Sequence, residues 1–360
     1  MVRQLPVWGP PQYPLDQSKS SVEKIDREYV KKCVDSGVTK LIPGGGSKNL
    51  VDEAHENGLL VEPYNAFPGH GGVNIEYQQW SSIYPSPGIE APESRPLLDK
   101  HRPIYAGPFA SLKISELAQK HPEYWARKKN TPDEMFPGQI LWLSLAHEAV
   151  REYEIQIYLD MLEETGGDGI QVEFVRGNED EHGVGIYGYE DKMVNGFINK
   201  FGKDPRIIGS DDSDWIQHRA DYTTLFLSEL RQKIKASNSA AVVSTTLIAQ
   251  ESDEYIKLFH DWPSWLDQGL VDEFYLWFRT NSDLNDLAKH MSHVANINSD
   301  RVPLIAELSC YHPGSFQEDD ALLEAAKVAL DNGADAVGVY RSHAVEQLNL
   351  WKTIENISKL

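Results

Sequence analysis

An alternation of short apolar segments with amphipathic segments constrains the fold of this chain more than any other feature. Eight segments have the length and apolar content of buried β-strands: 3–8, 39–43, 59–64, 170–175, 241–248, 271–279, 302–310 and 336–341. Each is followed by a segment with helical periodicity, at 26–36, 49–57, 146–164, 215–236, 253–268, 284–296, 318–332 and 345–360. Strands that alternate with helices of this length form parallel βαβ units. Eight units predict an α/β fold of the (β/α)₈ (TIM) barrel type, with an open doubly wound sheet as the alternative.

Two long stretches interrupt this alternation. Residues 68–140 follow the third predicted strand and residues 176–212 follow the fourth, and neither shows a regular period. Irregular insertions of this length in a compact domain are usually functional. Loops that follow the strands of such a barrel lie on its catalytic face. We therefore expect one catalytic barrel over residues 1–360, with both insertions on that face and with candidate cleft walls at Trp80, Trp125, Trp142, Tyr187 and Tyr189.

Composition narrows the classes of partner. The 360 residues include 34 Lys and Arg against 55 Asp and Glu, a net charge of −21, which disfavours nucleic acids and anionic membranes as partners. Cys33 and Cys310 lie far apart and belong to no metal-binding or disulfide motif, so we expect no metal and no cofactor. The first residues lack the apolar core of a signal peptide, which leaves a cytoplasmic protein or a processed periplasmic or secreted one as alternatives.

Two of the predicted strands carry a single glutamate near the C-terminal end. Glu173 interrupts the fourth strand, and the alternation of side chains turns it toward the barrel interior, away from Ile170 and Val172. Glu307 interrupts the seventh strand in the same way. A buried carboxylate is costly unless it has partners or a chemical role. One such acid is as readily a structural group paired to an arginine, but two facing one cavity are what glycoside hydrolysis requires.

Polar and aromatic residues gather at the ends of the same strands. We expect them to hold a hydroxylated or anionic sugar, because they would place donors and rings around one rim. The candidate substrate-binding residues are Tyr64, Asn65, His70, Trp142, Arg176, Trp277, Arg279, Tyr311, His312 and Arg341. For Trp277, a place in the barrel core is the alternative to a sugar-stacking wall.

A glutamate on the fourth strand with a second on the seventh resembles the large clan of retaining glycosidases built on this barrel. That resemblance implies that Glu173 is the acid/base and Glu307 the nucleophile. We expect a raised pKa at Glu173, and donors from Arg176, Arg341 and Tyr275 to keep Glu307 ionised. The sequence departs from the clan at Val172, where the clan usually has Asn. This departure keeps open a catalytically silent carbohydrate-binding barrel as the alternative function.

A closer resemblance covers about residues 121 to 235. It rests on His121-Pro-Glu-Tyr-Trp125, on the segment from Asp168 to Gly177, on Tyr187-Gly-Tyr-Glu190, and on Asp214-Trp215 with Arg219-Ala-Asp221. These motifs are similar to the family-10-like glycosyl hydrolase group of bacterial barrels. The resemblance implies a (β/α)₈ barrel that acts on a poly- or oligosaccharide.

Overall fold

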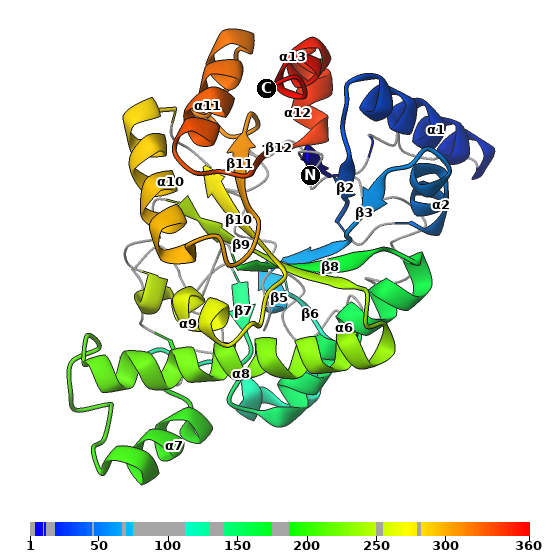
Figure 1. The fold of residues 1–360 in the computed structure, drawn as a ribbon. Helices are drawn as coiled ribbons and strands as arrows, with labels where there is room; N and C mark the ends of the chain where they lie inside the picture. The colour runs from blue at the N-terminus through cyan, green and yellow to red at the C-terminus, as the bar shows by residue number, and fades with distance from the viewer. Residues whose placement is uncertain are drawn as a thin grey trace.

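The computed structural model describes residues 4–9, 11, 19–44, 47–66, 70–74, 112–129, 140–174, 187–249, 255–278 and 282–360. Its centre is a sheet of parallel strands surrounded by helices (Figure 1). The strands, in spatial order, are β3 (Leu60–Val61), β2 (Lys40–Ile42), β1 (Pro6–Trp8), β12 (Ala336–Tyr340), β11 (Leu304–Ser309), β10 (Glu273–Phe278), β9 (Val242–Ile248), β8 (Gly169–Phe174) and β4 (Tyr64–Ala66).

The short segment 60–66 closes this sheet into a barrel. β3 pairs with β2 on one side, and β4 pairs with β8 on the other. Only Glu62 and Pro63 separate β3 from β4, and proline has no N–H to give to a strand ladder. The two pieces therefore form one barrel strand, and the eight predicted strands and the predicted (β/α)₈ fold are confirmed.

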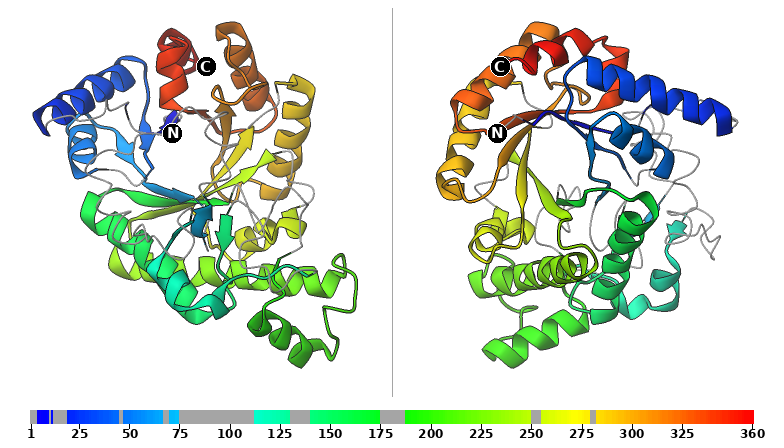
Figure 2. Two further views of the ribbon diagram at one scale, coloured as in Figure 1. Left: turned by 180° about the vertical axis from the view of Figure 1, so that it is seen from behind. Right: turned by 45° about the vertical axis from the view of Figure 1, so that its right-hand side comes forward.

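Helices surround the barrel in the order of the chain (Figure 2). They are α1 (Lys19–Asp35), α2 (Lys48–Glu56), α6 (Glu148–Thr165), α8 (Ser213–Ser237), α9 (Trp262–Asp267), α10 (Leu284–Asn298), α11 (Asp319–Asp331), α12 (Ser342–Gln347) and α13 (Trp351–Ile357). Their apolar faces and the outward side chains of the strands, such as Ile170 and Val172 of β8, form the largest core cluster. None of the described helices is long and apolar enough to span a bilayer.

Two predicted helices are each divided into two pieces. The helix expected at 253–268 is a 3₁₀ turn, η3 (Tyr255–Leu258), followed by α9, which begins just before Pro263 because proline fits only the first turn of a helix. The helix expected at 345–360 breaks between α12 and α13 at Asn349, whose φ of 55° is left-handed.

The two insertions contain regular structure that the sequence analysis missed. Within 68–140 lie a three-stranded antiparallel sheet, made of β5 (His70–Asn74), β6 (Leu112–Ile114) and β7 (Ile140–Trp142), and the short helices α5 (Glu116–Lys120) and η1 (Pro122–Tyr124). The second insertion holds α7 (Asp191–Phe201), which lies outside the helical ring beside α8 (Figure 1). The strands, α5 and η1 are too short for a periodic pattern to show. α7 is longer than α2 and amphipathic, so the signal that could have found it was present in the sequence.

Four equivalent clamps join alternate pairs of strands at the N-terminal end of the barrel. In each clamp, the residue that precedes one strand donates its backbone N–H to the carbonyl of a residue on the neighbouring segment. The side chain of the same preceding residue accepts a hydrogen bond from the backbone N–H of that neighbouring residue. The four pairs are Thr39 with Leu5, Asp168 with Val61, Asp272 with Val243, and Asp335 with Leu304, with side-chain distances of 2.7, 2.8, 2.9 and 2.8 Å. These clamps satisfy strand-end donors that would otherwise remain unpaired.

Candidate functional site

The carboxylates of Glu173 and Glu307 lie inside the barrel toward its C-terminal end. Glu173 stands two residues beyond Gln171, whose side chain accepts a hydrogen bond of 2.9 Å from the indole of Trp8 in the barrel interior. Glu307 stands two residues beyond Ile305, which packs in the interior cluster with Trp8. Side chains two apart on a strand share a face, so both acids point inward. Glu173 is 4% exposed and Glu307 0%.

Thr246 connects the two acids. It is in register with Glu173 on the neighbouring strand, and its hydroxyl donates to Oε2 of Glu307 over 3.3 Å. In the part of the chain that the structure describes, Oε1 of Glu307 is buried without a hydrogen-bond partner. Burial and the negative charge of Glu173 together raise the pKa of Glu307 well above its usual range. The two carboxylates are therefore close enough to interact, and this interaction adds to the proton affinity of Glu307.

The raised pKa of Glu307 differs from the expectation drawn from the resemblance. Glu307 was expected to be kept ionised by donors from Arg176, Arg341 and Tyr275, while the raised pKa expected at Glu173 stays a prediction. Arg176 lies outside the described residues, and neither Arg341 nor Tyr275 is among the groups that shift the pKa of Glu307. Which of two inward glutamates lies deeper depends on the packing of the strands around it, which sequence patterns do not encode.

Aromatic rings cover the C-terminal end of β10, β11 and β12 around this pair. Trp277 lies with its ring centroid 4.9 Å from Tyr340 and 5.2 Å from His312, and His312 stacks on Tyr340 at 5.6 Å. His312 is also fixed by Ser309, whose hydroxyl lies 2.9 Å from its Nδ1. Trp277 is only 4% exposed, so its position favours the alternative of a barrel-core residue over a broad stacking wall.

The charges of the acids and of Arg341 both act on Tyr64 and Tyr340. Burial raises the pKa of Tyr64, and the groups acting on it include Tyr340, Glu173, Arg341 and Glu307. Burial also raises the pKa of Tyr340 to about 12, with Arg341 and Glu173 among the charges that act on it. Tyr340 was not predicted from the sequence. Gly338 is in register with Glu307, and Tyr340, two residues later on β12, faces the same side of the sheet, which is the signal that could have found it.

The other predicted binding residues do not all join this group. Asn65 is in register with Val172, whose side chain packs on the helix side, so the alternation of β4 turns Asn65 away from the acids. Trp142 belongs to β7 and packs with Ala126 and Tyr187 in a separate cluster. The backbone of His70 lies in β5 opposite Trp142, while Arg176, Arg279 and Trp80 lie outside the described residues.

Two candidate cleft walls have structural positions instead. The indole of Trp125 donates to the carbonyl of Ala118 over 2.7 Å, within a cluster formed by α5 and α6. Tyr189 packs on Trp215 at 5.2 Å, in the cluster that joins α7 to α8. Aromatic residues in an insertion also build that insertion's own small core, which a sequence alone does not distinguish from a binding wall.

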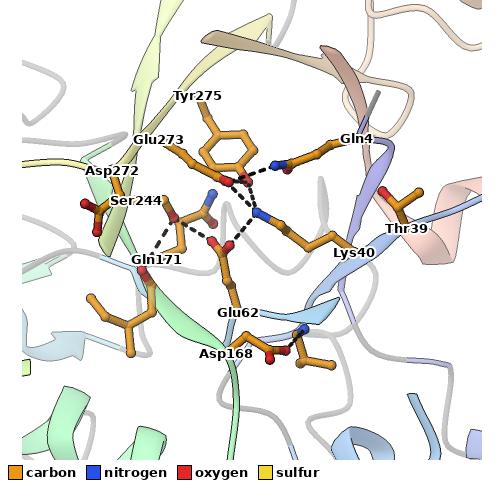
Figure 3. A network of polar contacts seen from close by, with 12 residues as sticks. Gln4, Thr39, Lys40, Glu62, Asp168, Gln171, Ser244, Asp272, Glu273 and Tyr275 are labelled. Atoms are coloured by element: carbon orange, nitrogen blue, oxygen red, sulfur yellow. Dashed lines mark hydrogen bonds and ion pairs between the residues drawn. The ribbon is translucent and has the colours of Figure 1, made fainter. Parts of the chain in front are cut away.

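A second group of buried charges lies deeper in the barrel and was not recognised as a group (Figure 3). Lys40, the first residue of β2, is 1% exposed and forms ion pairs with Glu62 and Glu273. Ser244 donates to Glu62 over 2.8 Å, and Gln4 and Tyr275 donate to Glu273 over 2.9 and 3.0 Å. All four carboxylate oxygens thus have a donor. Among the described residues, no cluster of His, Cys, Asp and Glu suits a metal ion.

Similarity to solved structures agrees with the barrel. The glycoside hydrolase domain of PgaB (BpsB) from Bordetella bronchiseptica superposes with a TM-score of 0.66 at 13% identity, over 99% of both chains. The β-galactosidase from the psychrophilic Marinomonas ef1 superposes with a TM-score of 0.63 at 12% identity, over 99% of this chain and 59% of the enzyme. No curated protein sequence is significantly similar to the chain.

Sequence comparison gives the family. The sequence model of the family described as glycosyl hydrolase-like 10 matches residues 102–304, which is more than half of the chain. The matched region includes Glu173 and most of the strands that carry the barrel's inward polar residues, and it ends at the first residue of β11. The chain belongs to the glycosyl hydrolase-like 10 family.

Proposed function

We propose that this barrel is a glycoside hydrolase that cleaves a poly- or oligosaccharide with Glu173 and Glu307 as its two carboxylates. The observation that carries the proposal is the pair itself: two buried glutamates on β8 and β11 that interact electrostatically at the C-terminal end of the barrel. Catalytic groups of such barrels occupy this end. The family membership and the glycosidase-like fold support the same reaction class.

The pair provides the two protonation states that the reaction needs. Two neighbouring carboxylates cannot both ionise cheaply, so near neutral pH they hold one proton between them. One carboxyl can then protonate the leaving oxygen while the other attacks the anomeric carbon. In the proposed retaining mechanism Glu173 is the acid/base and Glu307 the nucleophile.

Glu307 must be ionised for these roles to apply. Burial and the charge of Glu173 raise the pKa of Glu307 in the free protein. Positive charge that develops at the anomeric carbon favours the ionised form of the carboxylate beside it. A sugar bound against Glu307 would therefore move the proton toward Glu173. The opposite assignment, with Glu307 as the acid, is the outcome that an experiment has to separate from this one.

Azide rescue separates these assignments. Glu307→Ala and Glu173→Ala would be assayed on aryl glycosides with good and poor leaving groups, with the exposed change Glu152→Ala as a surface control. We expect Glu173→Ala to lose about 10²–10⁴-fold with poor leaving groups, to lose less with good ones, and to give a glycosyl azide of retained configuration. Glu307→Ala should be inactive, and azide should yield no retained product. The exchange of these two patterns would reverse the roles, and full activity in both variants would contradict the proposal.

A catalytically silent carbohydrate-binding barrel is the second candidate. It is favoured by Val172 before Glu173, where the retaining clan usually has Asn, and by the raised pKa of Glu307, which opposes the ionised form of a nucleophile. Binding of oligosaccharides without hydrolysis, unchanged in Glu307→Gln, is the result that would support it.

A further inference from the structure

Arg341 carries a positive charge that no acid neutralises within the described part of the chain. It follows β12 directly, and its guanidinium carbon lies 4.6 Å from the ring centroid of Tyr311 and 5.9 Å from that of Tyr340. Lys40, by contrast, is paired with two glutamates, and Arg151 forms an ion pair with Glu229 at 2.7 Å. Arginine cannot lose its proton in a protein, so its charge has to be stabilised where it stands.

Aromatic rings, not a carboxylate, hold this cation in place. Burial opposes the charge of Arg341, but Tyr340, Tyr64 and Tyr311 outweigh burial and keep the pKa of Arg341 above its usual range. Stacking on rings leaves N–H donors of the guanidinium available for a ligand, in addition to the hydrogen bond that Arg341 shares with Tyr340. The same charge does not lower the pKa of Glu307. Arg341 is therefore neither paired within the described chain nor used to ionise that catalytic candidate.

The position of Arg341 relates it to a sugar bound at the acids. Tyr64 experiences the charges of Glu173, Glu307 and Arg341 together, so the cation and the acids lie around one tyrosine. His343 also contacts Tyr311, with ring centroids 5.7 Å apart. Burial and Arg341 lower the pKa of His343, which favours the neutral histidine.

We propose that Arg341 binds an oxyanion of the substrate, a carboxylate or a sulfate ester on the sugar unit at the acids. This inference rests on the proposed carbohydrate function and adds the class of the sugar. Guanidinium groups bind such oxyanions through two parallel hydrogen bonds, which fixes orientation as well as charge. Because the chain carries a net charge of −21, attraction of an acidic glycan must come from a local cation of this kind.

Isothermal titration calorimetry with small sugars tests the inference apart from turnover. The probes are the methyl glycosides of glucuronic and galacturonic acid, the 6-sulfates of methyl glucoside and methyl galactoside, and the corresponding neutral methyl glycosides. We expect at least one acidic sugar to bind about tenfold or more tightly than its neutral counterpart. Arg341→Met should remove that preference, and Arg341→Lys, which keeps the charge but not the fork, should retain part of it. The uronates and the sulfates show separately which oxyanion is recognised.

A surface arginine provides the matched control. Arg206 forms an ion pair with Asp204 at 3.0 Å, and Arg206→Met should leave every affinity unchanged. Near-ultraviolet circular dichroism would establish that each variant is folded. Equal binding of acidic and neutral sugars, or a preference that survives Arg341→Met, overturns the role of Arg341 and leaves the proposed function intact. A wild-type protein that binds none of the sugars contradicts both.

Discussion

The barrel encloses two pairs of glutamates. Both pairs are buried, but they differ in the number of hydrogen-bond donors that their carboxylate oxygens receive. Glu62 and Glu273, in the deeper layer, share Lys40, and each of their oxygens accepts a hydrogen bond. Glu173 and Glu307, toward the C-terminal end, are as deeply buried, but Glu307 has only one hydroxyl donor among the described residues. Tyr275 lies between the two layers. Its pKa is raised by burial, by the charges of Glu62 and Glu273 in the deeper layer, and by the charge of Glu307 in the upper layer.

This difference separates a structural use of buried acids from a chemical one. A complete set of donors stabilises the charges of the deeper pair and fixes the strands that carry them. An incomplete set leaves a carboxyl with a high proton affinity and free hydrogen-bonding capacity, which is what a reacting group needs. The contrast predicts opposite effects of substitution on stability in the two layers.

Removal of the lysine should give the largest effect. Lys40→Met leaves Glu62 and Glu273 without their cation, and we expect a loss of about 3–5 kcal/mol in the free energy of unfolding, measured by urea denaturation. The triple variant with Glu62→Gln and Glu273→Gln should recover most of this loss, because it removes the unpaired charges. A loss that persists in the triple variant would mean that packing of the lysine stem, not charge, matters.

Neutralising the upper pair should act in the opposite direction. At pH 8 we expect Glu307→Gln to raise the free energy of unfolding by about 1 kcal/mol. Glutamine is neutral in both the folded and the unfolded state, so the cost of burying an ionisable carboxyl at this pH is removed. Glu273→Gln, the matched change in the deeper layer, should lower it, since three donors lose their charged acceptor. Equal losses in both variants would remove the distinction between the layers.

The pH dependence of stability sharpens the same comparison. Burial raises the pKa of Glu62 to about 7 and that of Glu307 well above its usual range. The folded state therefore binds protons that the unfolded chain releases above about pH 4.5, so the free energy of unfolding should fall as pH rises through 4.5 to 7. Urea titrations across this range should give a shallower slope in Glu62→Gln and in Glu307→Gln than in the wild-type protein.

The clamps at the N-terminal end of the barrel should give the smallest effects. Asp335→Ala removes the acceptor of the Leu304 N–H, and we expect a loss of about 1 kcal/mol in the free energy of unfolding. Asp331→Ala, an exposed change nearby on α11, is the control and should be neutral.

Acid titration tests the clamp formed by Asp272. Partial burial raises the pKa of Asp272, but hydrogen bonds from Arg231, Lys235 and the Val243 N–H outweigh it and lower the pKa to about 2. Its contribution is present above about pH 4 and is lost as pH falls toward 2. Asp272→Asn should therefore weaken the decline in unfolding free energy over this acid range, and an unchanged decline would contradict the assignment.

The sequence by itself determined the barrel and the two acids. Strand and helix periods are local properties, and eight alternations leave few topologies. The alternation of side chains within β8 and β11 was enough to turn Glu173 and Glu307 inward, because one face of each strand is continuously apolar. The same local reasoning failed for Asn65, whose strand is interrupted at Pro63, and for α7, which lies in an insertion.

Only the tertiary structure decided which charges meet. Lys40, Glu62 and Glu273 come from three strands, and nothing in their local sequence relates them. The proton affinity of Glu307 and the unneutralised charge of Arg341 depend on side chains from several elements. Ion pairing, side-chain burial and the number of hydrogen-bond donors depend on contacts across the barrel between residues far apart in the sequence. Hydrophobic periodicity and secondary-structure propensity are local and carry no information about such contacts.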